Sequence, residues 1–206
     1  MIDPLSLLAF VPAALALNLT PGADMMFCLG QGLRSGRRAA LAASAGITAG
    51  CMVHVVLAGL GLGALVAAVP GLFDVIRWAG VGYLLYLAWG AWRGGRAAAT
   101  GTAAPAARAF RAGFVVNLTN PKVILFVLAF IPQFVVPGAG PVLGQFLIYG
   151  AVLSLGGFFI NGLAGIFAGQ AGGRLTGSPV FARWLGRVSG TIFAALAVRL
   201  AIMERV

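Results

Sequence analysis

Few side chains in this 206-residue chain could do chemistry inside an apolar interior, and three of them lie within long apolar stretches. Asp24 is the only carboxylate well inside such a stretch, Lys122 is the only lysine and His54 is the only histidine. A carboxyl group in apolar surroundings can take up a proton, and imidazole titrates near neutral pH. An ammonium group can bind a substrate carboxylate. We therefore expect Asp24 and His54 to couple protons and Lys122 to bind substrate.

Each of these residues also has a structural interpretation. Asp24 lies about six residues from Gly30, or ~9 Å along a helix, so it could be hydrated near one membrane face. It could also stabilise the start of a helix, where a short acidic side chain is favourable. Lys122 could form an ion pair with Asp24, and a lone histidine in a helix can be a neutral packing residue. Asn161 could line a cavity or bond to a neighbouring helix. The sequence leaves these alternatives open.

A short Asn-Leu-Thr motif followed by proline occurs twice in the chain. The first copy is residues 18–22, and the second is residues 117–122, with one extra residue before the proline. Proline removes a backbone donor and clashes with the carbonyl four residues earlier, so each copy predicts a kinked or unwound helix. Two such breaks in corresponding positions favour a transporter binding site over two ordinary kinks. The residues predicted to bind substrate are Asn18, Pro21, Gly22, Asn117, Pro121 and Lys122.

The elements that must position these residues are membrane-spanning helices. Hydrophobic residues make up 61% of the chain, charged residues make up 9%, and the mean hydropathy is +1.01. A soluble domain of this size could not bury so much apolar surface, so we expect an all-α integral membrane protein. Its continuous apolar segments do not alternate as the strands of a membrane barrel would. Six segments are long enough to span a bilayer, at roughly 5–29, 40–68, 71–92, 112–136, 141–169 and 181–203.

Arginine residues in the gaps between these spans predict their orientation. The first, third and fifth gaps are basic, whereas the second and fourth are not. Basic loops stay in the cytoplasm, so both termini are predicted to lie outside a bacterial cytoplasmic membrane. The net charge of +10 has the same explanation, and we expect no nucleic-acid partner. The arginines concerned are Arg34, Arg37, Arg38, Arg93, Arg96, Arg108, Arg111, Arg174, Arg183 and Arg187.

The third gap divides a single transporter domain into two halves of three spans. We expect repeat 1 at residues 1–94, a cytoplasmic linker at 95–110 and repeat 2 at 111–206. Because three is odd, the second half enters the membrane from the opposite side, which gives an inverted repeat. Small residues four apart, such as Gly46 and Gly50, would allow close helix packing within the chain or in a homodimer.

Several motifs together resemble the LysE/RhtB family of amino-acid exporters. They are the two proline motifs, residues 32–38 (GLRSGRR), 46–50 (GITAG), 130–134 (FIPQF) and 187–190 (RVSG). The resemblance covers nearly the whole chain. It implies export of amino acids or related small metabolites, driven by the proton gradient. Because few acids are embedded, a neutral amino acid is the expected substrate, with protons and lipid as the other partners.

Other functional classes fit the sequence less well. The glycine-rich runs contain no phosphate-binding loop of the GxxxxGK[ST] type, so direct ATP drive is unsupported. Cys28 and Cys51 have no zinc-ligand spacing, and we expect neither a metal nor a cofactor. An intramembrane enzyme would need a nucleophile with a base, a pair of aspartates or a metal cluster, and only a Ser/His pair using His54 is formally available. A passive channel is the other alternative.

The arginine distribution leads to a test of topology. Single cysteines at residues 2, 101 and 205 would be treated with an impermeant thiol reagent in intact cells. We expect labelling at both termini and protection at residue 101, because basic loops stay inside. Labelling of residue 101 with protected termini would reverse the predicted orientation.

Overall fold

The computed structural model describes residues 4–68, 72–93, 105–136, 138–170 and 179–202. Within these ranges all regular structure is helical, which confirms the expected fold class at this level. The elements are α1 (Pro4–Leu19), α2 (Ala23–Ser35), α3 (Arg37–Ala68), α4 (Leu72–Trp92), α5 (Ala106–Leu118), α6 (Pro121–Ala129), the 3-10 turn η1 (Ile131–Phe134), α7 (Val142–Gln170) and α8 (Pro179–Ile202).

Two helix pairs bend at the two proline motifs. Helices α1 and α2 meet at 54° across residues 20–22, and α5 meets the segment Pro121–Phe134 at 55° across residues 119–120. Pro21 and Pro121 cannot donate a backbone hydrogen bond, so neither helix continues unbroken through its motif. Each proline lies at or just before the start of the second helix of its pair, where its missing N–H costs least.

Two of the six predicted spans are single long apolar helices, and two more are bent pairs of shorter helices. Helices α3 and α7 are each long and apolar enough to cross a membrane, over Arg37–Gly61 and Val142–Ala168. Each bent pair also qualifies when its two helices are counted as one span. Large apolar side chains on the outer faces of α3 and α7 are exposed, as lipid-facing residues would be: Leu57, Leu60, Leu155 and Phe159. Helices α4 and α8 coincide with the spans predicted at 71–92 and 181–203, although they are not among the helices that length and composition identify as membrane-spanning.

The helix ends differ from the predicted spans at two places. Helix α2 runs on to Ser35 instead of ending at residue 29, and α5 begins at Ala106 instead of residue 112. Hydropathy marks the apolar segment that crosses the bilayer core, and a helix can continue beyond it into polar surroundings. Residues 106–110 of the predicted linker are therefore helical, and residues 95–104 lie outside the described residues.

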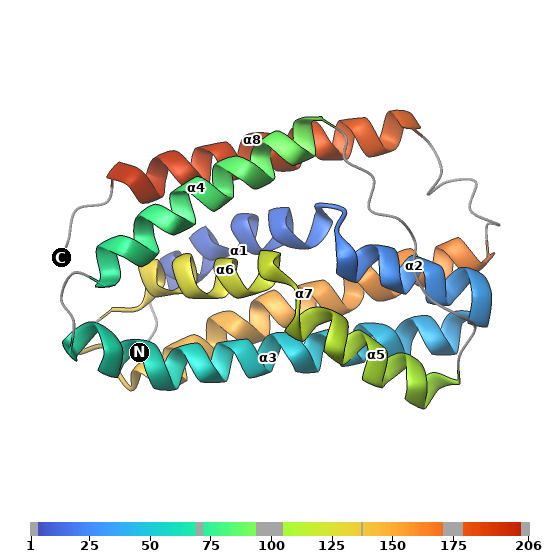
Figure 1. Ribbon diagram of the computed structural model, residues 1–206, viewed down its shortest axis with the longest axis horizontal. Coiled ribbons are helices and arrows are strands. Elements are labelled where there is room, and N and C mark those ends of the chain that lie inside the picture. The colour runs from blue at the N-terminus through green and yellow to red at the C-terminus, as the bar shows by residue number, and fades with distance from the viewer. Residues whose placement is uncertain (1–3, 69–71, 94–104, 137, 171–178, 203–206) are drawn as a thin grey trace.

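The helices form two outer groups with α1, α2 and α6 between them (Figure 1). Helices α4 and α8 pack side by side in one group, and α3 packs against α5 and α7 in the other. Between the groups, α1 contacts both α7 and α8, and α6 contacts both α3 and α4. Helix α2 packs against α3, α5 and α7. Thr20 of the first break and Asn120 of the second are buried within the helix assembly, whereas Thr119 and Pro121 are exposed.

A cluster of five buried aromatic side chains fixes α1 and α6 relative to α7. Phe10 of α1 lies at its centre, with its ring 5.0 Å from Tyr149 and 5.3 Å from Phe134. Phe126 and Phe130 stack within α6 and its end at 4.7 Å, and both rings also contact Phe10. Tilted aromatic pairs at such distances stabilise more than their buried area alone. This cluster holds the second half of one broken pair beside the first half of the other.

Glycines allow backbone contact at two helix crossings. A Cβ atom at Gly46 of α3 would overlap the carbonyl of Phe110 of α5, and one at Gly32 of α2 would overlap the carbonyl of Gly165 of α7. Such contacts need glycine because any side chain would push the backbones apart. They bring α2 and α5 close to the two long helices that face the breaks.

The crossing of α3 and α5 leads to a test with a matched control on the same helix. Gly46→Ala should lower stability by about 1–3 kcal/mol, because the methyl group has no space. A methyl group at Gly61 of α3 would meet no atom within 4 Å, so Gly61→Ala should leave stability unchanged or slightly raised. Thermal unfolding of both variants in detergent measures this. Equal melting temperatures would show that the crossing is not tight.

Candidate functional site

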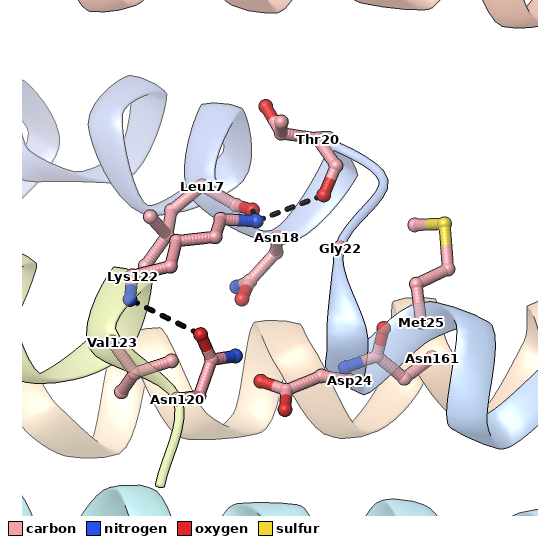
Figure 2. Close-up of a pocket in the computed structure, with 10 residues that line it drawn as sticks. All are labelled: Leu17, Asn18, Thr20, Gly22, Asp24, Met25, Asn120, Lys122, Val123 and Asn161. Carbon is pink, nitrogen blue, oxygen red and sulfur yellow. Dashed lines mark hydrogen bonds between the residues drawn. The ribbon is translucent and has the colours of Figure 1, made fainter. Parts of the chain in front are cut away.

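A small cavity lies between the two breaks (Figure 2). Its volume is about 20 Å³, which holds a water molecule but not an amino acid. Four of the predicted site residues line it, namely Asn18, Gly22, Asp24 and Lys122. The other lining residues are Leu17, Thr20, Met25, Asn120, Val123 and Asn161. The structure therefore brings both motifs to one polar cavity.

Lys122 caps the end of α1 (Figure 2). Its Nζ donates to the carbonyl oxygen of Leu17 at 2.6 Å and to that of Thr20 at 2.8 Å. The Leu17 carbonyl would normally accept from the residue four positions later, but that residue is Pro21, which has no N–H. The ammonium group supplies the missing donor and also lies at the negative end of the α1 dipole. In this conformation it bonds backbone carbonyls, and no hydrogen bond joins it to Asp24 within the described residues.

The second break has a similar arrangement. Pro121 leaves the carbonyl of Asn117 without its helical donor. That oxygen accepts instead from the backbone N–H of Asn120 at 2.9 Å, and it lies 3.3 Å from Nε2 of His54. His54 donates to it whenever this ring nitrogen is protonated. Each orphaned carbonyl therefore meets a basic side chain from the other half of the chain.

Asp24 lies in the first turn of α2 and faces the second motif. Its Oδ2 accepts from Nδ2 of Asn117 at 2.9 Å. Its Oδ1 is buried without a hydrogen-bond partner among the described residues, and so is Nδ2 of Asn120, which faces Asp24 across the cavity in Figure 2. A buried carboxylate oxygen without a donor is costly, so this position can accept one further donor, from the Asn120 amide, a water molecule or a cationic ligand. The first turn of α2 adds a favourable dipole to the Asp24 carboxylate.

Asn18 and Asn117, the first residues of the two proline motifs, pack against glycines of α7 and α3, respectively. Asn18 donates to the carbonyl of Leu153 in α7 at 2.9 Å, and its side chain lies against Gly156 and Gly157. Asn117, which is 1% exposed, packs against Gly50 of α3. A side chain on these glycines would meet the asparagines at 2.9–3.1 Å, so the glycines make room for them. Asn18 thus joins α1 to α7, whereas Asn117 joins α5 to Asp24.

A second cavity of similar size adjoins the first. It shares Asn18, Asp24 and Asn161 with the first cavity and reaches Asn117. Its further polar lining comes from α3 and α7, with Thr48, Cys51 and Ser154. Asp24 lies on both cavities, so a ligand that merged them would contact it from two sides.

Sequence reasoning did not select every residue of this site. Asn120 is the extra residue before the proline of the second motif. An asparagine directly before a proline could have predicted the N-cap of α6, which the structure shows it to be. Asn161 lines both cavities, which resolves the open choice in favour of a cavity position. Neither proline lines the first cavity, and His54 contacts the site only through Asn117 among the described contacts.

Apolar helices with two breaks around a polar cavity are typical of secondary transporters. The family model described as LysE type translocator matches residues 15–204. The chain belongs to this family, which confirms the resemblance drawn from its motifs.

Relatives from bacteria support this membership. The chain is 37% identical over 145 residues to a "Homoserine/homoserine lactone efflux protein" of Salmonella typhimurium, covering 69% of this chain and 70% of the relative. It is 33% identical over 198 residues to a membrane protein of Vibrio cholerae, covering 94% and 95%. It is 32% identical over 200 residues to a "Leucine efflux protein" of an Enterobacter species, covering 95% and 94%. No solved structure gives a significant match.

The contact between Asp24 and Asn117 leads to a double-mutant cycle. Asp24→Ala and Asn117→Ala should couple by about 1.5–3 kcal/mol in unfolding free energy, because they remove one charge-assisted hydrogen bond. Gln145→Ala supplies the control, since Gln145 bonds Val136 and Gly140 instead. Its effect should add to that of Asp24→Ala within about 0.5 kcal/mol. Additivity of the Asp24 and Asn117 variants would mean that the contact is not energetically formed.

Proposed function

We propose that this protein is a secondary exporter of amino acids or related small solutes across the bacterial cytoplasmic membrane. The supporting comparisons are a translocator family and relatives named for homoserine and leucine efflux. The observation that best supports a site at the breaks is the buried, unpartnered Oδ1 of Asp24 on a cavity between two interrupted helices. Interrupted helices leave backbone donors and acceptors free to bind a solute.

The site offers complementary groups for a zwitterion. A substrate ammonium group would donate to Oδ1 of Asp24, and a carboxylate would be attracted by Lys122 and by the free N–H groups at the start of α2. Among the described residues, Asp24 is the only carboxylate that lines either cavity. A second cationic group on the substrate would have no acidic partner there, so a neutral amino acid fits best. Binding needs the cavity to enlarge from its present 20 Å³.

Proton coupling follows from competition at Asp24. A carboxyl group that is protonated cannot also accept strongly from a substrate ammonium group, so loading favours loss of the proton. A proton arriving from outside would in turn favour release of the substrate. His54 contacts this site through the Asn117 carbonyl, to which the neutral ring donates when its proton is on Nε2.

The arrangement of basic residues supports the proposed orientation. The end of α2, the start of α3 and the start of α5 lie together at one end of the molecule in Figure 1, whereas α1 begins toward the other end. Arg34, Arg37 and Arg38 belong to the first two of these segments, and Arg108 and Arg111 belong to the third. We place this end in the cytoplasm. Each bent pair then forms one span of an inverted six-span repeat that exposes the cavity alternately to the two sides.

Efflux from proteoliposomes tests the function and the role of Asp24 together. Vesicles holding the full chain and loaded with labelled L-leucine or L-homoserine should release it faster when the outside is acidic. Asp24→Asn should abolish this proton-driven release yet permit exchange of labelled for unlabelled substrate, because the amide cannot titrate. Asp74→Asn, at a carboxylate in the first turn of α4, is the matched control and should behave as wild type.

The alternatives give different results. Release that is equally fast without a pH gradient, and that does not show counterflow, would indicate a channel. Unchanged pH-driven release in Asp24→Asn would leave Asp24 with a structural role only. If vesicles that contain the folded protein release no labelled amino acid, with or without a pH gradient, the proposed function is wrong.

A further inference from the structure

We propose that the ammonium group of Lys122 occupies the place of the substrate's amino group while the carrier is empty, and that a bound primary ammonium displaces it. This inference rests on the proposed export of amino-bearing solutes and adds a subsite to it. The subsite consists of the carbonyl oxygens of Leu17 and Thr20, which Lys122 now bonds at 2.6 and 2.8 Å. Its ligand is any small primary ammonium ion.

The carbonyl pair is suited to an ammonium because of how α1 ends. The Leu17 oxygen lacks a helical donor, since Pro21 follows four residues later. Thr20 lies in the break between α1 and α2, and its own hydroxyl donates to the carbonyl of Ala16 at 2.6 Å. The carbonyl oxygens of Leu17 and Thr20 therefore meet a common donor at the negative end of the α1 dipole. Lys122 reaches this position from α6, on the other half of the chain.

The same cavity contains a third acceptor that Lys122 does not use. Oδ1 of Asp24 is buried without a partner among the described residues, and Asp24 lines the cavity together with Leu17, Thr20 and Lys122. An ammonium ion has three donors, and it could bond one or both carbonyls and this oxygen if the Lys122 side chain moved away. A tethered amine thus satisfies the carbonyls when no substrate is present and leaves them when a better-placed amine arrives. Once displaced, it is free to pair with the substrate carboxylate.

The single lysine of the chain makes the displacement measurable in the wild-type protein. Lysine labelled with ¹³C at Cε gives one side-chain signal, from Lys122, in the purified full chain. Addition of n-butylammonium chloride should shift this signal in a saturable manner, and L-leucine should do the same. Tetramethylammonium, which has no N–H donor, and n-butanol, which has no charge, should not. A signal that n-butylammonium leaves unmoved would overturn the proposal.

A second experiment uses a variant in which the subsite is vacant. Lys122→Ala should have a lower melting temperature than wild type, and n-butylammonium at about five times its dissociation constant should raise it by about 2–4 °C. The matched control is Asn161→Ala, which shortens another lining side chain but leaves Lys122 on its carbonyls. n-Butylammonium must displace the lysine in this variant, so at the same concentration it should stabilise Asn161→Ala less than Lys122→Ala. Equal stabilisation of both variants, or equal stabilisation by n-butanol, would contradict an ammonium subsite. If Lys122→Ala does not fold, the wild-type signal still decides.

These outcomes are separable from those of the transport assay. Amino-acid efflux with an unmoved Lys122 signal would retain the proposed function and remove the displaced amine. A Lys122 signal that shifts with n-butylammonium in a protein that moves no amino acid would retain the subsite and remove the proposed function.

Discussion

Two backbone carbonyls without helical donors determine much of this structure. Pro21 and Pro121 remove the usual helical donors of the Leu17 and Asn117 oxygens, and the Asn117 oxygen accepts instead from the backbone N–H of Asn120. An apolar surrounding offers no water to replace lost donors. Both breaks therefore lie between the outer helix groups, where other segments supply donors. Lys122 bonds the first carbonyl and His54 approaches the second. The positions of Lys122 and His54 are therefore determined by the backbone carbonyl oxygens that they contact.

Close helix packing is what allows these contacts to form. Gly46 lets α3 contact the backbone of α5, and Gly32 lets α2 contact α7, so the halves with the breaks lie near the long helices. At the other end, Phe10 and its aromatic neighbours hold α1 and α6 together, which keeps Lys122 within reach of α1. The glycine crossings on one side and the aromatic cluster around Phe10 on the other therefore position the polar cavity between them. A side chain at Gly32 would push α2, which carries Asp24, away from α7.

The parts that sequence could predict are those fixed by local chemistry. Continuous apolar segments predicted helices, and two prolines predicted two bends, because both effects act within a few residues of the chain. Helices α2 and α5 extend beyond the predicted spans, because hydropathy marks only the apolar segment that crosses the bilayer core and a helix can continue past it. The partners of Lys122 and Asp24 depend on contacts between residues about a hundred positions apart, which one sequence does not contain. An ion pair between these two residues was a reasonable alternative, but their hydrogen bonds here go to other groups.

The charge balance of the interior follows from the same contacts. The described lining of the first cavity includes one carboxylate and one ammonium group, so the empty site is neutral overall when both are ionised. A zwitterion adds no net charge, and it can therefore enter without leaving an uncompensated charge away from water. A dibasic solute would add a positive charge that only a proton released from elsewhere could offset. The requirement that charge stay balanced in an apolar interior thus supports the proposed neutral amino acid over a dibasic one. The same balance is consistent with the two proposals made above, that Asp24 exchanges a proton and that Lys122 moves.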